Sequence, residues 1–179
     1  AETHALLGRF RKQVDFDWAE AEREMRRALE LNPTSPVVVY RYATSYLMPR
    51  GRMAEAITEL KRVLEFDPLD LNVRSWLAAL HWISRGYDES EEQLRLVFEV
   101  DPQYPLAHLV LGQTRCMEHK FEEAIATLRK AVELHGGSTW VKSWLGLALA
   151  QGGHTSEARA QLESMHNAAV QAYVPPAAF

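Results

Sequence analysis

The sequence predicts an all-α protein made of antiparallel helix hairpins, and two observations carry this prediction. The first is a spacing that recurs five times: a large apolar residue, a small residue directly after it, and a second small residue 12 or 13 positions later. The second is a stop signal between successive copies, either an Asn-Pro or Asp-Pro pair or two adjacent glycines. Because each copy holds two amphipathic stretches separated by turn residues, each is expected to fold as one helix hairpin.

The small residues define the period of the chain. In the first helix of each hairpin they are Gly8, Ala43, Ala78, Gly112 and Gly146. In the second helix they are Ala21, Ala56, Ser90, Ala124 and Ala158, at intervals of 35, 34, 34 and 34 residues. Two helices that approach closely leave no room for a larger side chain there, and overpacking costs about 1–3 kcal/mol. The first two hairpins carry one extra residue, which in the first is expected to lengthen the turn at 15–18.

Stop and start signals set the expected helix boundaries. First helices are expected at roughly 36–48, 70–84, 104–118 and 138–151. Second helices are expected at roughly 17–31, 52–66, 88–100, 121–134 and 155–170. Proline after Asn32, Asp67 and Asp101 ends three of the second helices, because proline cannot continue the hydrogen-bond ladder. Gly136 and Gly137 end the fourth through a left-handed cap, and Asp88 with Glu91 predicts a capping box.

A period near 34 residues with these residue types in phase resembles the tetratricopeptide repeat, and the resemblance covers nearly the whole chain. It implies a right-handed α-solenoid, a single array over residues 1–179. Its repeats are expected at 1–33, 34–68, 69–102, 103–136 and 137–170, with 171–179 as the start of a truncated sixth unit. The acidic and aromatic turn at 15–18 is similar to tetratricopeptide arrays of bacterial multidomain regulators. We therefore expect a segment of a longer signalling or transcription-regulatory protein.

Charge and composition exclude several partner classes. The net charge of −4 is confined to residues 69–102, which hold three basic and seven acidic residues, so no basic face predicts nucleic-acid binding. No apolar run is long enough for a membrane span, and no signal peptide is recognised. The single cysteine, Cys116, forms no internal disulfide, which favours a reducing, cytoplasmic location.

The sequence predicts no enzyme. It lacks a phosphate-binding GxxxxGK[ST] loop, an HExxH zinc pair and a GxSxG nucleophile elbow. The histidines are scattered, and His119, three residues after Cys116, has no third metal ligand nearby. No catalytic, cofactor-binding or metal-binding residue is therefore expected.

The family resemblance implies that the first helices line a concave groove that binds a partner. Aligning the repeats of this chain with the family pattern assigns the following residues to the groove: Val37, Tyr40, Thr44, Leu47, Met48, Asn72, Ser75, Trp82, Ile83, Leu106, Leu109, Gln113, Met117, Trp140, Ser143 and Leu147. Tyr40 and Thr44 stand where family members that clamp chaperone tails carry Lys and Asn, so chaperone-tail binding is not expected. The mostly apolar lining favours an amphipathic helix or an extended apolar segment.

Three alternatives for the groove stay open. A neighbouring segment of the parent chain could cover it, the residues could belong to the core, or Asn72, Gln113 and Gln151 could form a small-molecule sensor. If the groove binds a separate protein, Tyr40, Trp82 and Trp140 are expected to supply most of the binding energy. Because a sixth unit is cut, the last stacking surface is also expected to promote self-association.

Overall fold

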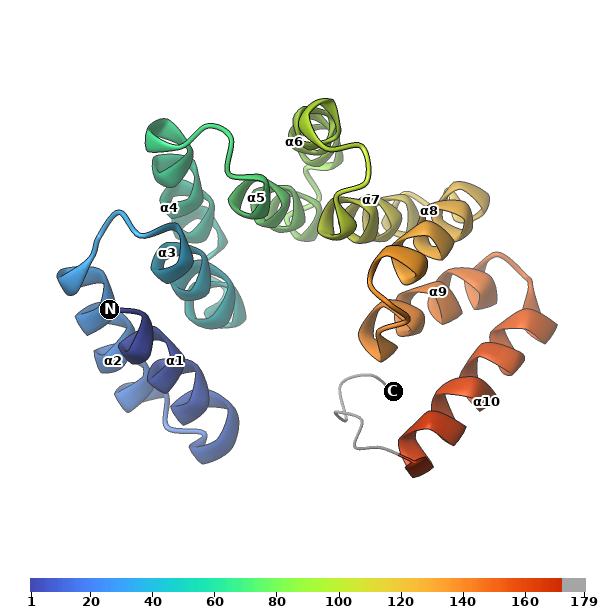
Figure 1. Ribbon diagram of the computed structural model, residues 1–179, viewed down its shortest axis with the longest axis horizontal. Helices are drawn as coiled ribbons and strands as arrows, with labels where there is room; N and C mark the ends of the chain where they lie inside the picture. The colour runs from blue at the N-terminus through green and yellow to red at the C-terminus, as the bar shows by residue number, and fades with distance from the viewer. Residues whose placement is uncertain (172–179) are drawn as a thin grey trace. The chain divides into compact units, whose positions relative to one another are not determined.

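The computed structural model describes residues 1–171, which form helices joined by short turns and contain no strand (Figure 1). The chain divides into two compact units, unit 1 (Ala1–Gly86) and unit 2 (Tyr87–Phe179). The division falls inside the third predicted repeat, so the two helices of that repeat belong to different units. The predicted all-α class of helix hairpins is confirmed. The predicted sixth unit begins at the last residue of the final helix and otherwise lies outside the described residues.

Unit 1 is a run of helices that pack on their neighbours in sequence. Its elements are α1 (Glu2–Phe10), the π-helical segment η1 (Arg11–Asp15), α2 (Trp18–Leu31), α3 (Pro36–Tyr42), the π-helical segment η2 (Ala43–Leu47), the 3₁₀ turn η3 (Met48–Arg50), α4 (Met53–Phe66) and α5 (Leu71–Ile83). α1 packs against α2, and α4 packs against η2 and α5. α3 contacts both α1 and α2, so each hairpin covers one face of the hairpin before it.

Unit 2 repeats the same arrangement. Its elements are α6 (Tyr87–Val100), α7 (Pro105–Met117), α8 (Phe121–Leu134), α9 (Thr139–Gln151) and α10 (Thr155–Gln171). α7 pairs with α8 and α9 pairs with α10 as antiparallel hairpins, while α9 also packs on α8 and α7 (Figure 1). The observed helix bounds agree with the predicted second helices to within one residue.

The extra residue of the first two hairpins lies inside a helix, which corrects the expectation of a longer turn in the first hairpin. Phe16 and Gly51 have positive φ in the turns of the first two hairpins. In both hairpins the small residue of the second helix, Ala21 or Ala56, follows five positions later. Before the turn, however, Gly8 to Phe16 and Ala43 to Gly51 span eight residues, whereas Ala78 to Arg85 spans seven. The π-helical segments η1 and η2 fall in this interval. A π-helical turn holds one more residue than an α-helical turn, so it absorbs the insertion and keeps the hairpin register.

Side-chain caps start several helices where expected. The Asp17, Ser35 and Asp70 side chains each accept a hydrogen bond from a backbone N–H of the first turn, at 2.9, 3.4 and 2.9 Å. The predicted capping box at Asp88 is wrong, because α6 already begins at Tyr87 and places Asp88 within its first turn. The predicted stop at Gly136 and Gly137 is confirmed, since both have positive φ (61° and 77°) after α8.

The requirement for a small residue differs among the hairpins. A Cβ atom on Gly112 would lie 2.5 Å from Cγ of Leu128, and one on Gly8 would lie 2.9 Å from Cγ of Met25. At Gly146 the nearest neighbour would be Cγ of Gln161, at an ordinary 3.7 Å. Close helix packing therefore explains the glycine in the first and fourth hairpins, and the fifth hairpin is looser at this position.

Candidate protein-binding surfaces

The predicted groove residues divide between the two units and differ in exposure. Five are buried in the core: Thr44, Leu47, Ser75, Leu109 and Gln113. Eight are half-buried: Val37, Tyr40, Met48, Asn72, Trp82, Leu106, Met117 and Ser143. Ile83, Trp140 and Leu147 are exposed. The five buried side chains form contacts inside the chain and present no surface to a partner in this structure.

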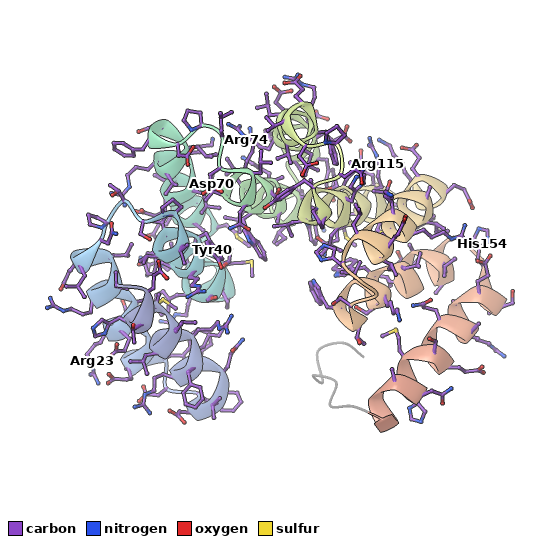
Figure 2. All side chains as sticks on the ribbon, in the orientation of Figure 1. Arg23, Tyr40, Asp70, Arg74, Arg115 and His154 are labelled. Atoms are coloured by element: carbon purple, nitrogen blue, oxygen red, sulfur yellow. The ribbon has the colours of Figure 1, made fainter. Side chains whose placement is uncertain are left out.

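In unit 1, the half-buried Tyr40 belongs to an aromatic pair that joins two helices. The rings of Tyr40 (α3) and Trp76 (α5) stack with centroids 6.3 Å apart and an angle of 8° between their planes. The Arg41 guanidinium lies 5.9 Å from the centre of the Tyr40 ring, and its Nε donates a 3.4 Å hydrogen bond to the Tyr40 hydroxyl. Figure 2 shows Tyr40 on α3. The pair offers a flat, partly exposed aromatic surface with a cation at its edge.

Trp76 was not among the predicted groove residues, although its neighbour Tyr40 was. Register placed Trp76 one position away from the residues that the family resemblance assigns to the groove. A tryptophan three positions after Val73 on an amphipathic helix was the available signal, but that spacing equally predicts a core residue.

In unit 2, three of the predicted residues lie on α9. The Trp140 ring packs edge to face on Trp144, with centroids 6.3 Å apart, and stays 48% exposed. Ser143 and Leu147 line an open cavity of about 490 Å³ between α9 and α10. We call this cavity the α9–α10 groove; its other lining residues include Gly146, Ala150, Thr155, Ala158, Arg159, Gln161, Leu162 and Met165.

A second exposed apolar surface, on α1, was not predicted. Leu6, Leu7, Phe10 and Val14 follow a three-and-four spacing along α1 and η1, and each is more than a third exposed. The spacing was visible in the sequence, but an amphipathic helix normally turns such a face to the core. In the structure α1 uses Ala5 and Gly8 to contact α2 and leaves these larger residues uncovered.

In unit 2, charged side chains tie helices together rather than converge on an open site. Arg115 on α7, labelled in Figure 2, pairs with Glu91 on α6, with Glu118 directly after α7 and with Glu123 on α8. Nε2 of His154, directly before α10, lies at a hydrogen-bond distance of 2.8 Å from the accepting carboxylate of Glu122 on α8. This carboxylate raises the pKa of the exposed His154 imidazole above its usual value. These contacts link neighbouring helices of unit 2.

Cys116 is buried, and the metal-ligating side chains of residues 1–171 form no cluster. Burial raises the pKa of the Cys116 thiol to about 11, so the thiol stays protonated and unreactive at neutral pH. No group of three or more His, Cys, Asp or Glu side chains lies close enough together to hold a metal ion in this part of the chain. In the same residues no helix is both long enough and apolar enough to cross a membrane.

Comparison with known proteins agrees with this architecture. The tetratricopeptide repeat family model matches residues 15–80. Human tetratricopeptide repeat protein 13 is 26% identical over 110 residues, which are 62% of this chain but only 13% of that relative. The chain therefore spans a small part of that protein's length.

Solved structures extend the likeness over both units. A thermophilic tetratricopeptide protein from Thermus thermophilus has a TM-score of 0.79 at 22% identity, covering 92% of this chain and 90% of that one. Pseudomonas aeruginosa PilF gives 0.70 at 19% identity, covering 92% and 74%. MamA from Desulfovibrio magneticus RS-1 gives 0.65 at 18% identity, covering 96% and 98%. The repeated hairpins, the family-model match at residues 15–80 and the shared fold together support an assignment to the tetratricopeptide repeat family.

Proposed function

We propose that this chain is a protein-interaction module that holds an amphipathic helix or an extended apolar segment against the exposed side chains of its first helices. The fold supports a general scaffold role, because stacked helix hairpins present extended binding surfaces without a catalytic centre. The observation that carries the finer proposal is that large aromatic side chains on these helices reach the surface: Trp140 is exposed in unit 2, and the Tyr40–Trp76 pair is half-buried in unit 1. Aromatic anchors of this kind dominate the energetics of protein interfaces.

An apolar peptide fits these surfaces better than an acidic or basic one. The exposed residues among those predicted are apolar in each unit, Ile83 in unit 1 and Trp140 and Leu147 in unit 2. In unit 2 the half-buried Leu106 and Met117 are apolar as well. Methionine and tryptophan adapt to irregular apolar partners, and a helix that presents residues at i, i+3 and i+7 matches such a strip. We place the module in the cytoplasm, within a larger bacterial signalling or transcription-regulatory protein, on the family resemblance of its first turn.

The alternative role as a small-molecule sensor has less support. It requires the polar groups of Asn72, Gln113 and Gln151 on one open surface. Gln113 is 5% exposed, and Asn72 belongs to unit 1 whereas Gln113 and Gln151 belong to unit 2. Neither unit supplies all three groups as one exposed site.

A pull-down with matched variants tests the proposal. The immobilised chain is compared with Trp140→Ala, Tyr40→Ala and the control Phe66→Ala, whose ring is 70% exposed on α4 outside the proposed surface. We expect specific proteins to be retained by the wild type and the control and lost with Trp140→Ala or Tyr40→Ala. Each retained protein is then tested by calorimetry with purified components. Equal retention by all four chains, with unchanged melting temperatures, would contradict the proposal.

A further inference from the structure

The junction between the first two hairpins brings two cations onto one tryptophan. Trp18 is the first residue of α2, and Nζ of Lys12, on η1, lies 5.8 Å from the centre of its ring. The guanidinium carbon of Arg50, on η3, lies 5.7 Å from the same centre and 6.0 Å from the centre of the Tyr46 ring. The Trp18 and Tyr46 rings lie 6.4 Å apart. We call Lys12, Trp18, Tyr46 and Arg50 the Trp18 cluster.

The Trp18 cluster lies within unit 1, at a contact between two successive hairpins. Lys12 follows Ala5 and Gly8 at helical spacing, and these two buried residues mark the face with which α1 contacts α2 and α3. α2 in turn contacts both η1, which carries Lys12, and η2, which carries Tyr46. The cluster is therefore built entirely from elements that pack on one another inside unit 1.

Lys12 and Arg50 form no ion pair with any of residues 1–171; their contacts are with the aromatic rings. Basic residues close to them in sequence do pair: the pairs are Arg11–Asp15 and Arg52–Glu55, at 2.7 and 2.6 Å. The difference shows that carboxylates neutralise the surrounding arginines but leave the two cations of the cluster without a counter-charge in this part of the chain.

The carboxylates beside the cluster already have partners. Glu22 accepts a hydrogen bond from the Tyr46 hydroxyl and pairs with Arg26 at 2.5 Å. Asp17 accepts a 2.9 Å hydrogen bond from the backbone N–H of Glu20 and so caps α2. Neither carboxylate can turn to the cluster without giving up one of these contacts.

This arrangement favours an anionic ligand. Burial and the nearby Arg9 guanidinium lower the pKa of the Lys12 ammonium group, so its charge is both poorly solvated and repelled by a like charge. Arg50 is exposed, which leaves the second cation open to a ligand. Arginine donates paired hydrogen bonds to the oxygens of an anion, whereas lysine binds phosphate as a point charge. An anion beside both groups would offset the unfavourable environment of Lys12.

We propose that the Trp18 cluster binds a phosphate group, with Arg50 donating hydrogen bonds to two of its oxygens and Lys12 supplying the second positive charge. A phosphomonoester carries about −1.5 to −2 charges at pH 7, so it matches two cations better than a carboxylate does. The Trp18 and Tyr46 rings hold the guanidinium through cation–π contacts and orient it before the ligand arrives. The proposal does not depend on the partner surface at Tyr40 and Trp140, so the two proposals fail separately.

Tryptophan fluorescence of the full chain tests this site. Inorganic phosphate and O-phosphoserine are titrated at constant ionic strength, with acetate as the singly charged comparison. We expect a saturable change with both phosphates that Trp18→Phe removes, because an anion beside the cations changes the field at the Trp18 ring. Tighter binding of O-phosphoserine would indicate a phosphorylated side chain as the source, and tighter binding of inorganic phosphate a free phosphate; either supports the shared chemistry. No saturable change, or equal binding of acetate, would overturn the proposal.

Variants of the two cations test the assigned roles. Lys12→Gln and Arg50→Gln should each weaken phosphate binding at least about tenfold, because each removes one charged contact. Arg50→Lys keeps the charge but not the paired donors, so a smaller loss is expected. Lys61→Gln, which removes an exposed cation of α4 outside the cluster, should bind like the wild type. Circular dichroism checks that each variant folds. Unchanged binding in both glutamine variants of the cluster, or an equal loss with Lys61→Gln, would contradict the site.

Discussion

The α7–α8 and α9–α10 hairpins follow the same residue pattern, yet they differ in what covers them. In the first, Gly112 meets Leu128 so closely that an added methyl group would clash, and Leu128 is fully buried. In the second, Gly146 has room beside it and Leu162 is 57% exposed. The pattern thus determines the hairpin, while the helix stacked on the hairpin determines how tightly its outer face is packed.

The largest expected difference between the two hairpins comes from truncating the paired leucines. Leu128→Ala should lower the free energy of unfolding by about 2–5 kcal/mol, because it leaves a cavity in the core. Leu162→Ala should lower it by less than about 1 kcal/mol, because the side chain is already solvated in the free chain. Urea unfolding at low protein concentration measures both values. Similar losses for the two variants would show that Leu162 is covered within a single chain.

The glycine pair should give a smaller difference with opposite signs. Gly112→Ala forces Leu128 to move and should destabilise the chain by about 1–3 kcal/mol. Gly146→Ala fits without a clash and should stabilise it by up to about 1 kcal/mol, because alanine favours the helix over glycine. Thermal unfolding of both variants tests this. A loss at Gly146 equal to that at Gly112 would contradict the looser packing of the fifth hairpin.

Periodicity predicted the hairpins well because local signals determine them. The left-handed turns, the caps at Asp17 and Asp70 and the stop at Gly136 depend on residues within a few positions of one another. The location of the extra residue was not predictable in this way, since a turn insertion and a π-helical segment have the same sequence length.

For the groove, register placed Tyr40 and Trp140 on partly exposed surfaces but also selected Leu47 and Ser75, which are buried. Exposure depends on how neighbouring helices stack, and the apolar face of α1 was missed for the same reason.

The smallest predicted effect concerns pH and the junction between α8 and α10. His154 pairs with Glu122, and its raised pKa means that the folded chain holds the proton more tightly than the unfolded chain. This stabilisation is fully present below the unfolded pKa of about 6.5 and is lost as pH rises through the folded pKa. Melting temperatures from pH 5 to 8 should therefore show a small decline that Glu122→Gln reduces, while Glu157, 3.5 Å from the imidazole, keeps part of it. A decline that is unchanged in Glu122→Gln would show that another group is responsible.

The most direct test of the comparison introduces a cysteine into the α9–α10 groove. The chain already carries a buried cysteine, Cys116, at the equivalent position of the α7–α8 hairpin. Ala150 lies 34 residues after Cys116 and lines the α9–α10 groove, so Ala150→Cys samples the same position of the two hairpins. Alkylation of the full chain, followed by mass spectrometry of the peptides, reports both sites at once. We predict that the new thiol reacts rapidly in the folded chain, while Cys116 stays unreacted until the chain unfolds. A new thiol as protected as Cys116 in the folded chain would contradict an open α9–α10 groove.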